Sequence, residues 1–408
     1  MLKRVNWYNN LVFSFLITIF FSNNIIASDK LSLKSYINNE NSESFWLFNN
    51  TGGIDLNEHT INLLISEKNN RISYQISTFF QQNLNIVGES FIKIDFDKSS
   101  FIRIGQYYRD YSLYLNDRIS LGHMLISYNA LPMKKVGYVS KNKRNNFLNF
   151  QYGISHGVFD ENTIYTKAPF LHEKFIYLNY SKGKHSFSLG FVHEAIWSGE
   201  INNEGKQPSS FKDYLKVIIA ADEPIKEGQD HANAMGNHLG IWDFNYQIKI
   251  NSNEIKMYHQ HFFEDTSGLR FANGIDGLWG IEFIDINNEK NILVEYLHTT
   301  NQDNDPPYIN DAYYNHGLYK NGWSFKNKTL GNPYINSNEI LPINVVNIGF
   351  SSNSKNYFYE CKSSRMTNIQ DDWNYMASIK KKISKMIIGL TITNTFDNGT
   401  GIMINLEI

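Results

Sequence analysis

Residues 241–250 read IWDFNYQIKI, and from Trp242 onward apolar and polar side chains alternate without a break. Successive side chains of a β-strand point to opposite faces, so this pattern predicts a strand with one apolar and one polar face. The apolar face would carry Trp242, Phe244, Tyr246, Ile248 and Ile250, and the polar face Asp243, Asn245, Gln247 and Lys249. Ten residues is about the length of a tilted strand that spans a membrane. A strand of a soluble β-sandwich would alternate in the same way.

The connections between such segments favour a barrel. Residues 92–97, 356–362 and 402–408 alternate with the same period. Short polar turns, typical of tight hairpins, stand at Lys182-Gly183-Lys184, Asn251-Ser252-Asn253, Asn287-Asn288, Ser352-Asn353-Ser354 and Asp397-Asn398-Gly399. The other connections are long and polar, and the two longest run from Gly199 to Gly240 and from Asn301 to Leu341. Tight turns that alternate with long loops are typical of an outer-membrane barrel.

The composition indicates a folded chain rich in β-structure. Of the 408 residues, 42% are hydrophobic, 15% aromatic and 19% charged, and the mean hydropathy is -0.40. This profile excludes a helical membrane protein and argues against a disordered chain. A formal net charge of -2 gives no basic field for nucleic acid, which we do not expect as a partner. The single cysteine, Cys361, excludes an internal disulfide framework, and by alternation it falls on the lipid-facing side of its strand.

The first residues have the layout of a secretory signal peptide. Lys3 and Arg4 precede an apolar run over residues 11–21, which is shorter than the roughly 20 residues that an α-helix needs to cross a bilayer. We therefore predict a signal peptide over residues 1–28, cleaved near Ala27 or Ser28, and one barrel domain over residues 29–408. At about 21 residues per strand with half of each turn, this domain predicts an all-β, up-and-down antiparallel transmembrane barrel of about 18 strands.

One segment resembles a known family. Residues 121–138 read LGHMLISYNALPMKKVGY, and they resemble a segment of the Wzi-type capsule assembly proteins. The match is carried by Leu125, Ser127, Asn129, Ala130 and Pro132, which we expect to be structural. Further segments that look like family landmarks follow in order at 171–199, 258–268, 275–283, 295–299 and 322–333.

The resemblance implies an 18-stranded outer-membrane lectin barrel of a Gram-negative bacterium. Such a barrel binds capsular or other surface polysaccharide and helps retain the capsule, without catalysis. Outer-membrane lipid and lipopolysaccharide would surround it. No ATP-binding or transferase motif is visible, so polysaccharide export machinery would be a separate partner. One feature differs from longer family members: only residues 30–44 could form the helical bundle that plugs their periplasmic mouth, so the state of the lumen stays open.

The long loops supply candidate groups for binding polysaccharide. Aromatic faces can cover the apolar faces of sugar rings, while amides and carboxylates take the hydroxyl groups. The candidates are Trp197, Tyr313, Tyr314, His316, Trp323, Tyr334, Asp303 and Asp305. Loop lysines, such as Lys320 and Lys326, could pair with the carboxylates of an acidic polymer. Aromatic residues are also enriched in the girdles at both interfaces of a barrel, so either role fits them.

Other chemistry is less well supported. His259 and His261 share a strand face and Glu264 follows, but a zinc site would need a third ligand in a geometry that sequence cannot supply. No recognisable motif surrounds a nucleophile or a base. We therefore predict no catalytic residue, no metal and no cofactor. A porin or solute-specific diffusion channel stays open as an alternative, since polar lumen faces such as Asp243 to Lys249 also line open channels.

Overall fold

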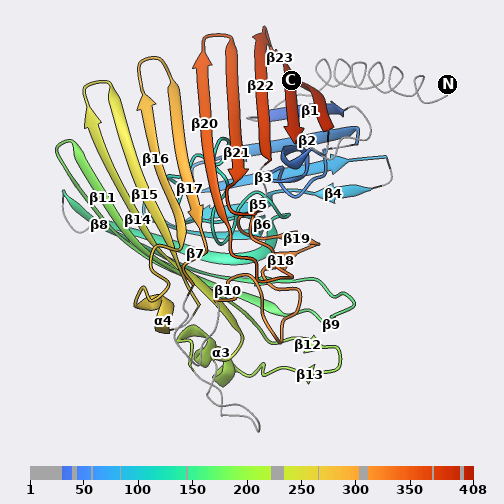
Figure 1. The fold of residues 1–408 in the computed structure, drawn as a ribbon, viewed down its shortest axis with the longest axis vertical. Helices are drawn as coiled ribbons and strands as arrows, with labels where there is room; N and C mark the ends of the chain where they lie inside the picture. Colours follow the sequence, from blue (N-terminus) through green and yellow to red (C-terminus); the bar gives the residue numbers. More distant parts are fainter. Residues whose placement is uncertain are drawn as a thin grey trace.

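The computed structural model describes residues 30–38, 44–56, 58–82, 84–143, 146–221, 234–264, 266–302, 311–369, 372–395 and 399–408. These residues confirm the predicted all-β architecture, a closed antiparallel barrel of 18 strands (Figure 1). Closure is direct, because β1 pairs with β2 on one side and with β24 on the other. The predicted signal peptide, residues 1–28, lies outside the described residues.

The wall is built from strands that follow one another around the barrel. They are β1 (Lys30–Asn38), β2 (Thr60–Lys68), β3 (Ile72–Phe80), β4 (Asn85–Val87) with β5 (Ser90–Asp95), β6 (Ser100–Tyr107), β7 (Met133–Lys143), β8 (Leu148–Val158), β10 (Phe170–Lys182), β11 (His185–Trp197), β14 (Asn237–Ile250), β15 (Asn253–Phe263), β16 (Gly277–Asp285), β17 (Lys290–His298), β20 (Asn344–Ser354), β21 (Tyr357–Met366), β22 (Trp373–Ile383), β23 (Met386–Thr395) and β24 (Gly399–Glu407). Because β4 and β5 both pair with β3, they occupy a single place in the wall.

Short elements lie in the connections. They are α2 (Phe45–Phe48), β9 (Tyr165–Lys167), β12 (Glu200–Ile201), β13 (Gly205–Lys206), α3 (Phe211–Ile218), α4 (Thr266–Leu269), β18 (Ser324–Phe325) and β19 (Lys328–Thr329). Among the described residues, no α-helix is both long and apolar enough to cross a bilayer.

The two ends of the barrel differ as predicted. Tight turns join strands at one end, whereas α3, α4, β12 and β13 lie at the other (Figure 1). The turns predicted at 182–184, 251–253 and 287–288 are confirmed by the strand bounds. The turn predicted at 352–354 is shifted, because β20 continues to Ser354 and the chain reverses at Lys355, which adopts a φ of 42°. Asp397 and Asn398 lie outside the described residues, and Gly399 begins β24.

The region considered for a helix forms a strand instead. Within residues 30–44, β1 occupies Lys30–Asn38, where Leu33 and Ile37 are buried. This strand completes the ring, and its backbone groups are satisfied on both edges. A helix here would leave the edges of β2 and β24 unpaired, which a barrel in a bilayer cannot tolerate.

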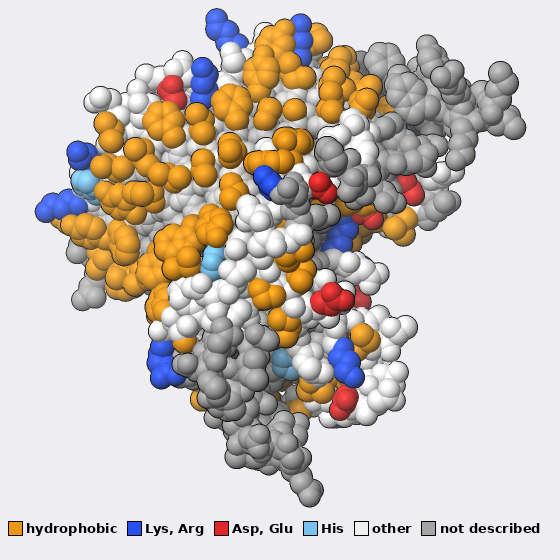
Figure 2. All heavy atoms as spheres, viewed as in Figure 1, with side chains coloured by type: hydrophobic (Ala, Val, Ile, Leu, Met, Phe, Trp, Pro, Cys, Tyr) orange, Lys and Arg blue, Asp and Glu red, His pale blue; other side chains and the backbone are white. Residues whose placement is uncertain are grey.

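The alternation of side chains places an apolar surface outside. Ile176, Ile281 and Ile348 point outward and are 50%, 47% and 49% exposed, whereas Asp243 points inward and is fully buried. Figure 2 shows the outward hydrophobic side chains as a broad patch over the strand wall. Cys361 is exposed, as expected for an outward position on β21. The outer face of the wall therefore has the chemistry that contact with lipid requires.

Candidate functional site

The lumen is occupied by a segment of the chain itself. Residues 108–132, hereafter the plug, connect β6 to β7 and carry the first family-like motif. Apolar side chains such as Ile119, Leu121 and Met124 are completely buried. The plug hydrogen-bonds to inward side chains of β11, β14, β15, β17 and β20, which stand around much of the wall. The plug therefore lies inside the barrel and does not merely cover its opening.

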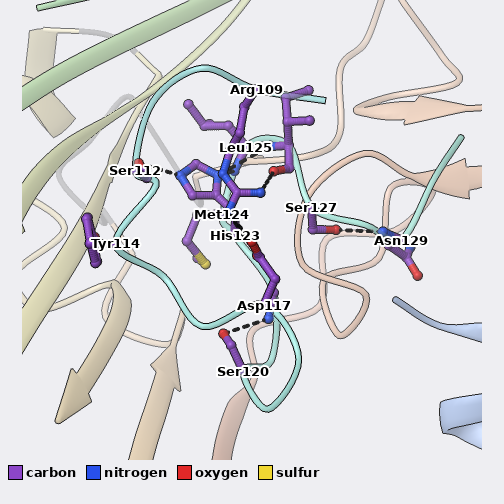
Figure 3. Close-up of polar contacts among 12 residues, drawn as sticks. Arg109, Ser112, Tyr114, Asp117, Ser120, His123, Met124, Leu125, Ser127 and Asn129 are labelled. Carbon is purple, nitrogen blue, oxygen red and sulfur yellow. Dashed lines mark hydrogen bonds and ion pairs between the residues drawn. The ribbon is translucent and has the colours of Figure 1, made fainter. Parts of the chain in front are cut away.

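A polar core gives the plug its shape (Figure 3). The Arg109 guanidinium donates two hydrogen bonds to the Asp117 carboxylate, at 2.8 and 2.7 Å, and a third to the Ile126 carbonyl at 3.0 Å. Bidentate pairs of this kind fix orientation as well as adding energy. Arg109 therefore ties the two ends of the plug together.

His123 connects this core to the wall. Its Nδ1 accepts hydrogen bonds from the backbone N–H groups of Leu125 and Ile126, at 3.0 and 3.2 Å. Burial, with a smaller contribution from Arg109, holds the pKa of His123 well below its usual value, so the ring is neutral and its proton lies on Nε2. Nε2 then donates to the Ser112 hydroxyl at 2.9 Å, and Ser112 donates to Asp243 of β14 at 2.6 Å.

Buried carboxylates of the wall hold the plug in place. Asp243 accepts hydrogen bonds from Ser112, from Tyr114 and from Tyr177 of the wall. Burying a carboxylate is costly unless donors surround it. Since two of these three donors come from the plug, removing the plug would leave Asp243 short of partners.

Glu295 of β17 repeats this arrangement on another part of the wall. It accepts from the Ser120 hydroxyl at 2.6 Å and from the Leu121 backbone N–H at 2.7 Å. Tyr258 and Asn347, both from the wall, complete its surroundings. Glu194 of β11 accepts from Tyr111, and Asn116 donates to Glu282 at 2.8 Å. Four carboxylates of the lumen face, Glu194, Asp243, Glu282 and Glu295, are therefore bonded to the plug.

A second segment packs against the plug at the loop end of the barrel. Residues 311–343, hereafter the cap, belong to the connection between β17 and β20. Trp323 is fully buried and its Nε1 donates to the Leu125 carbonyl at 2.8 Å. Tyr314, also fully buried, donates to the Met124 carbonyl. The cap and the plug form one packed unit.

The motif residues of the plug meet the cap. Ser127 donates through its backbone N–H to the Leu330 carbonyl at 2.8 Å, and through its hydroxyl to Gly331 at 2.6 Å. The Asn129 amide donates to the Thr329 carbonyl at 2.9 Å. Leu125, Ala130 and Pro132 are buried beside them. These five residues therefore lie where packing, not solvent contact, dominates.

The predicted glycan-binding aromatic residues are mostly inside the protein. Tyr313, Tyr314, Trp323, Tyr334 and Trp197 are 3%, 0%, 0%, 6% and 7% exposed. Tyr313 donates to Asp276 at 2.5 Å, and the Tyr334 hydroxyl bonds with Ser364 at 2.7 Å. Trp197 stacks on Tyr214 outside the lumen, apart from the cap. His316 is half-buried, and Asp303 and Asp305 lie outside the described residues.

Sequence reasoning missed the residues that carry the lumen network. Arg109 and His123 sit in a segment without a periodic pattern, and the roles of Glu194 and Glu295 depend on what faces them across the lumen. A signal was present, because Glu194 and Glu295 both fall in segments that resemble the family. A carboxylate at an inward position of a barrel strand needs donors, and a plug is one source of them.

Within the part of the chain that the structure describes, the lumen beside the plug holds cavities, of which two are lined by polar side chains. One, of about 550 Å³, is lined by groups that suit sugar hydroxyls and ring faces, among them Trp46, Tyr128, Asp117, Glu360, Lys362 and Asn405. The other, of about 420 Å³, is lined by Gln151, Asn179, Ser188, Asn245 and Gln247. Among the described residues, no three His, Cys, Asp or Glu side chains lie together so as to hold a metal ion.

Comparison with solved structures finds matches of low identity that cover most of both chains. OccK5 (OpdH) of Pseudomonas aeruginosa is 8% identical, with a TM-score of 0.46, covering 93% of this chain and 96% of that chain. OccK3 (OpdO) of the same organism is 8% identical, with a TM-score of 0.47 and coverages of 92% and 93%. A loop-deletion mutant of OmpT from Vibrio cholerae is 8% identical, with a TM-score of 0.35 and coverages of 93% and 97%.

Comparison with curated proteins finds no match. Comparison with protein families does: the family described as capsule assembly protein Wzi matches residues 120–354, which is more than half of the chain. The matched region holds much of the plug, the cap, and the wall residues Glu194, Asp243 and Glu295 that anchor the plug. The chain belongs to the Wzi family of capsule assembly proteins.

Proposed function

We propose that this outer-membrane barrel binds capsular or related surface polysaccharide and retains it on the cell, without catalysing a reaction. The observation that carries the proposal is the occupied lumen of a capsule assembly barrel. Plug and cap take up much of the interior, and four inward carboxylates, Glu194, Asp243, Glu282 and Glu295, are bonded to the plug. Such an interior favours a rigid binding scaffold over a diffusion channel.

The loop end is the proposed place of binding. The buried aromatic residues Tyr313, Tyr314, Trp323 and Tyr334 would act indirectly, by fixing the shape of the cap. The exposed Lys320 and the half-buried His316 of the cap remain candidates for direct contact. A lysine there would attract the carboxylates of an acidic polymer as a point charge. Asp303 and Asp305 stay as predicted contacts. Trp197, the last residue of β11, would also act indirectly, since its ring is buried against Tyr214 of α3.

Location follows from the same proposal. Residues 1–28 would direct export and be removed, and the barrel would insert into the outer membrane of a Gram-negative bacterium with its long loops outside. Outer-membrane lipid would surround the apolar wall. The polymer itself would arrive through separate export machinery.

The test is the partition of surface polysaccharide between cells and medium. A strain that lacks the protein is compared with its parent, and then complemented with the wild type, with Lys320→Glu, or with Lys385→Glu. Lys385 lies in the turn between β22 and β23, at the opposite end of the barrel, so it is a matched control for charge reversal. We expect polymer to move into the medium without the protein and with Lys320→Glu only. An unchanged partition, together with reduced uptake of a solute, would instead identify a channel.

A further inference from the structure

Polar side chains stand on the outer face of the wall at the loop end. His156, His172, His193 and His238, hereafter the histidine belt, point outward from β8, β10, β11 and β14. Strand register brings them together, since His172 lies opposite His156, and His238 lies opposite Ala195. Lys174 lies opposite His193 in the same belt. Polar groups on the lipid-facing side of a barrel are destabilising unless they are covered or paired.

α3 covers this belt. The Tyr214 hydroxyl hydrogen-bonds with His156 Nε2 at 2.5 Å, and its ring meets His172 edge-on at 5.6 Å. Lys174 donates to the carbonyl of Ile218, at the end of the helix. Val217, fully buried, packs in a cluster with Ala195 and Trp197 of β11. His172 is 0% exposed, and His193 and His238, which stack on each other beside it, are 4% and 6% exposed.

The uncovered side of α3 is apolar. Phe211, Leu215 and Ile219 follow one another at intervals of four residues and are 75%, 47% and 74% exposed. Residues at this spacing share one face of a helix. The helix start is well defined, because Ser210 and Asp213 form a capping box. The three exposed apolar side chains therefore lie on a short helix whose start is fixed by its cap.

The lysines of α3 border this row. At 100° per residue, Lys212 and Lys216 lie about 20° and about 60° beyond Ile219, on the side of the helix away from Val217. The exposed apolar row lies next to the side of α3 that faces the barrel. The apolar surface of the helix is therefore wider than the part that the barrel covers. An amphipathic helix with this distribution is suited to a membrane interface.

The exposed row continues the lipid-facing surface of the wall. On β10, Lys174 bonds to the end of α3. The next outward residue of this strand, Ile176, is 50% exposed. On β8, Ile154 follows His156 in the same direction and is 40% exposed. In these two strands no polar outward residue therefore separates the belt that α3 covers from the apolar band of the barrel.

We propose that α3 is embedded in the outer leaflet, as a part of the membrane-contacting surface laid over the histidine belt. Phe211, Leu215 and Ile219 contact the acyl chains of lipid. Lys212 and Lys216 extend toward anionic headgroup phosphates, since lysine can keep its stem in an apolar layer and its charge in a polar one. This assignment concerns the membrane and does not depend on what the cap binds.

The test places a fluorescent probe at single positions. In a Cys361→Ala background, cysteines are introduced one at a time at Phe211, Leu215, Ile219, Lys212 and Lys216, and labelled with an environment-sensitive fluorophore. Ile176→Cys is the control for lipid contact and Ile340→Cys, 47% exposed on the cap before labelling, is the control for water. Each protein is reconstituted in vesicles of phosphatidylethanolamine and phosphatidylglycerol. A shift in gel mobility on heating verifies that each barrel is folded.

Two quenchers separate the outcomes. Brominated acyl chains quench probes in the bilayer, and iodide, present on both sides of the membrane, quenches probes in water. We expect the probes at 211, 215 and 219 to lose fluorescence with brominated lipid, as at 176, and those at 212 and 216 to respond more to iodide. Quenching of all five by iodide alone, as at 340, would overturn the proposal. So would protection of 215 from both quenchers together with crosslinking between copies, because a second chain would then cover the row.

Discussion

At the scale of single residues, buried carboxylates hold the interior together. Asp243 and Glu295 are both fully buried and both accept hydrogen bonds from wall and plug. Buried carboxylates of this kind are stable only while their hydrogen-bond donors stay in place. The integrity of the plug should therefore depend strongly on a few side chains.

Asp243→Ala is expected to loosen the plug. The change leaves the hydroxyls of Ser112, Tyr114 and Tyr177 without their shared acceptor, which should lower the free energy of unfolding by about 3 kcal/mol. Urea titration of the folded barrel in detergent micelles measures the change. Gln247→Ala, on the same face of β14 but in the cavity beyond the plug, should cost much less. Equal losses for both variants would show that Asp243 has no special role.

His316 gives the cap a dependence on pH. Its Nδ1 accepts hydrogen bonds from the backbone N–H groups of Leu318 and Tyr319, at 3.2 and 3.1 Å. Burial, with a smaller contribution from His238, lowers the pKa of His316 to about 4. The folded protein therefore binds this proton more weakly than the unfolded chain does. Because of His316, the free energy of unfolding should fall as the pH drops from about 6.5 toward about 4. Below that pH, the effect of His316 should level off.

The measurement is the free energy of unfolding against pH for the wild type and His316→Asn. Asparagine keeps an acceptor near the position of Nδ1 but does not titrate in this range. We expect a smaller loss of stability between pH 6.5 and 4 in the variant. Parallel curves for the two proteins would contradict a role for His316.

At the scale of elements, the strands were predictable and the plug was not. A strand such as β14 can be recognised from its own residues, because outward and inward side chains alternate and contact with lipid requires the outward ones to be apolar. The prediction over residues 241–250 missed only the first four residues of β14, where His238 and Gly240 interrupt the apolar face. The path of the plug depends on partners far away in the sequence, such as Glu295 and Asn347, and no local period encodes it.

The sequence indicates which kinds of residues the long loops carry, but not where in the folded loops each side chain lies. Aromatic residues were expected in the long loops, but the sequence does not tell a ring that packs inside the cap from one at its surface. Trp323 is an example, since only the structure places it against Leu125 of the plug. His316 is half-buried and Lys320 is exposed, and their contact with glycan stays a prediction.

Trp323 tests the junction of cap and plug. Trp323→Ala removes a large, fully buried ring and is expected to destabilise the protein by about 3 to 5 kcal/mol. Trp323→Phe keeps most of the packing and loses the hydrogen bond to Leu125, a loss of about 1 kcal/mol. Limited proteolysis should cut the cap readily in the alanine variant and slowly in the phenylalanine variant. If neither variant is cut faster than the wild type, another contact fixes the cap.

At the scale of the whole molecule, three layers have separate roles. The apolar outer wall suits contact with lipid, the plug and cap occupy much of the lumen, and Lys320 of the cap is exposed at the loop end. An occupied lumen favours the proposed binding at the surface over an open channel built on the same kind of barrel.

The most direct test of this account is single-channel conductance in a planar bilayer. The wild type is compared with a variant in which residues 108–132 are replaced by a short Gly-Ser linker. This connection is feasible because Tyr107 and Met133 are directly paired across β6 and β7. We predict no steady large openings for the wild type and steady openings once the plug is removed. Steady large openings of the wild-type protein would contradict the account and identify a diffusion channel.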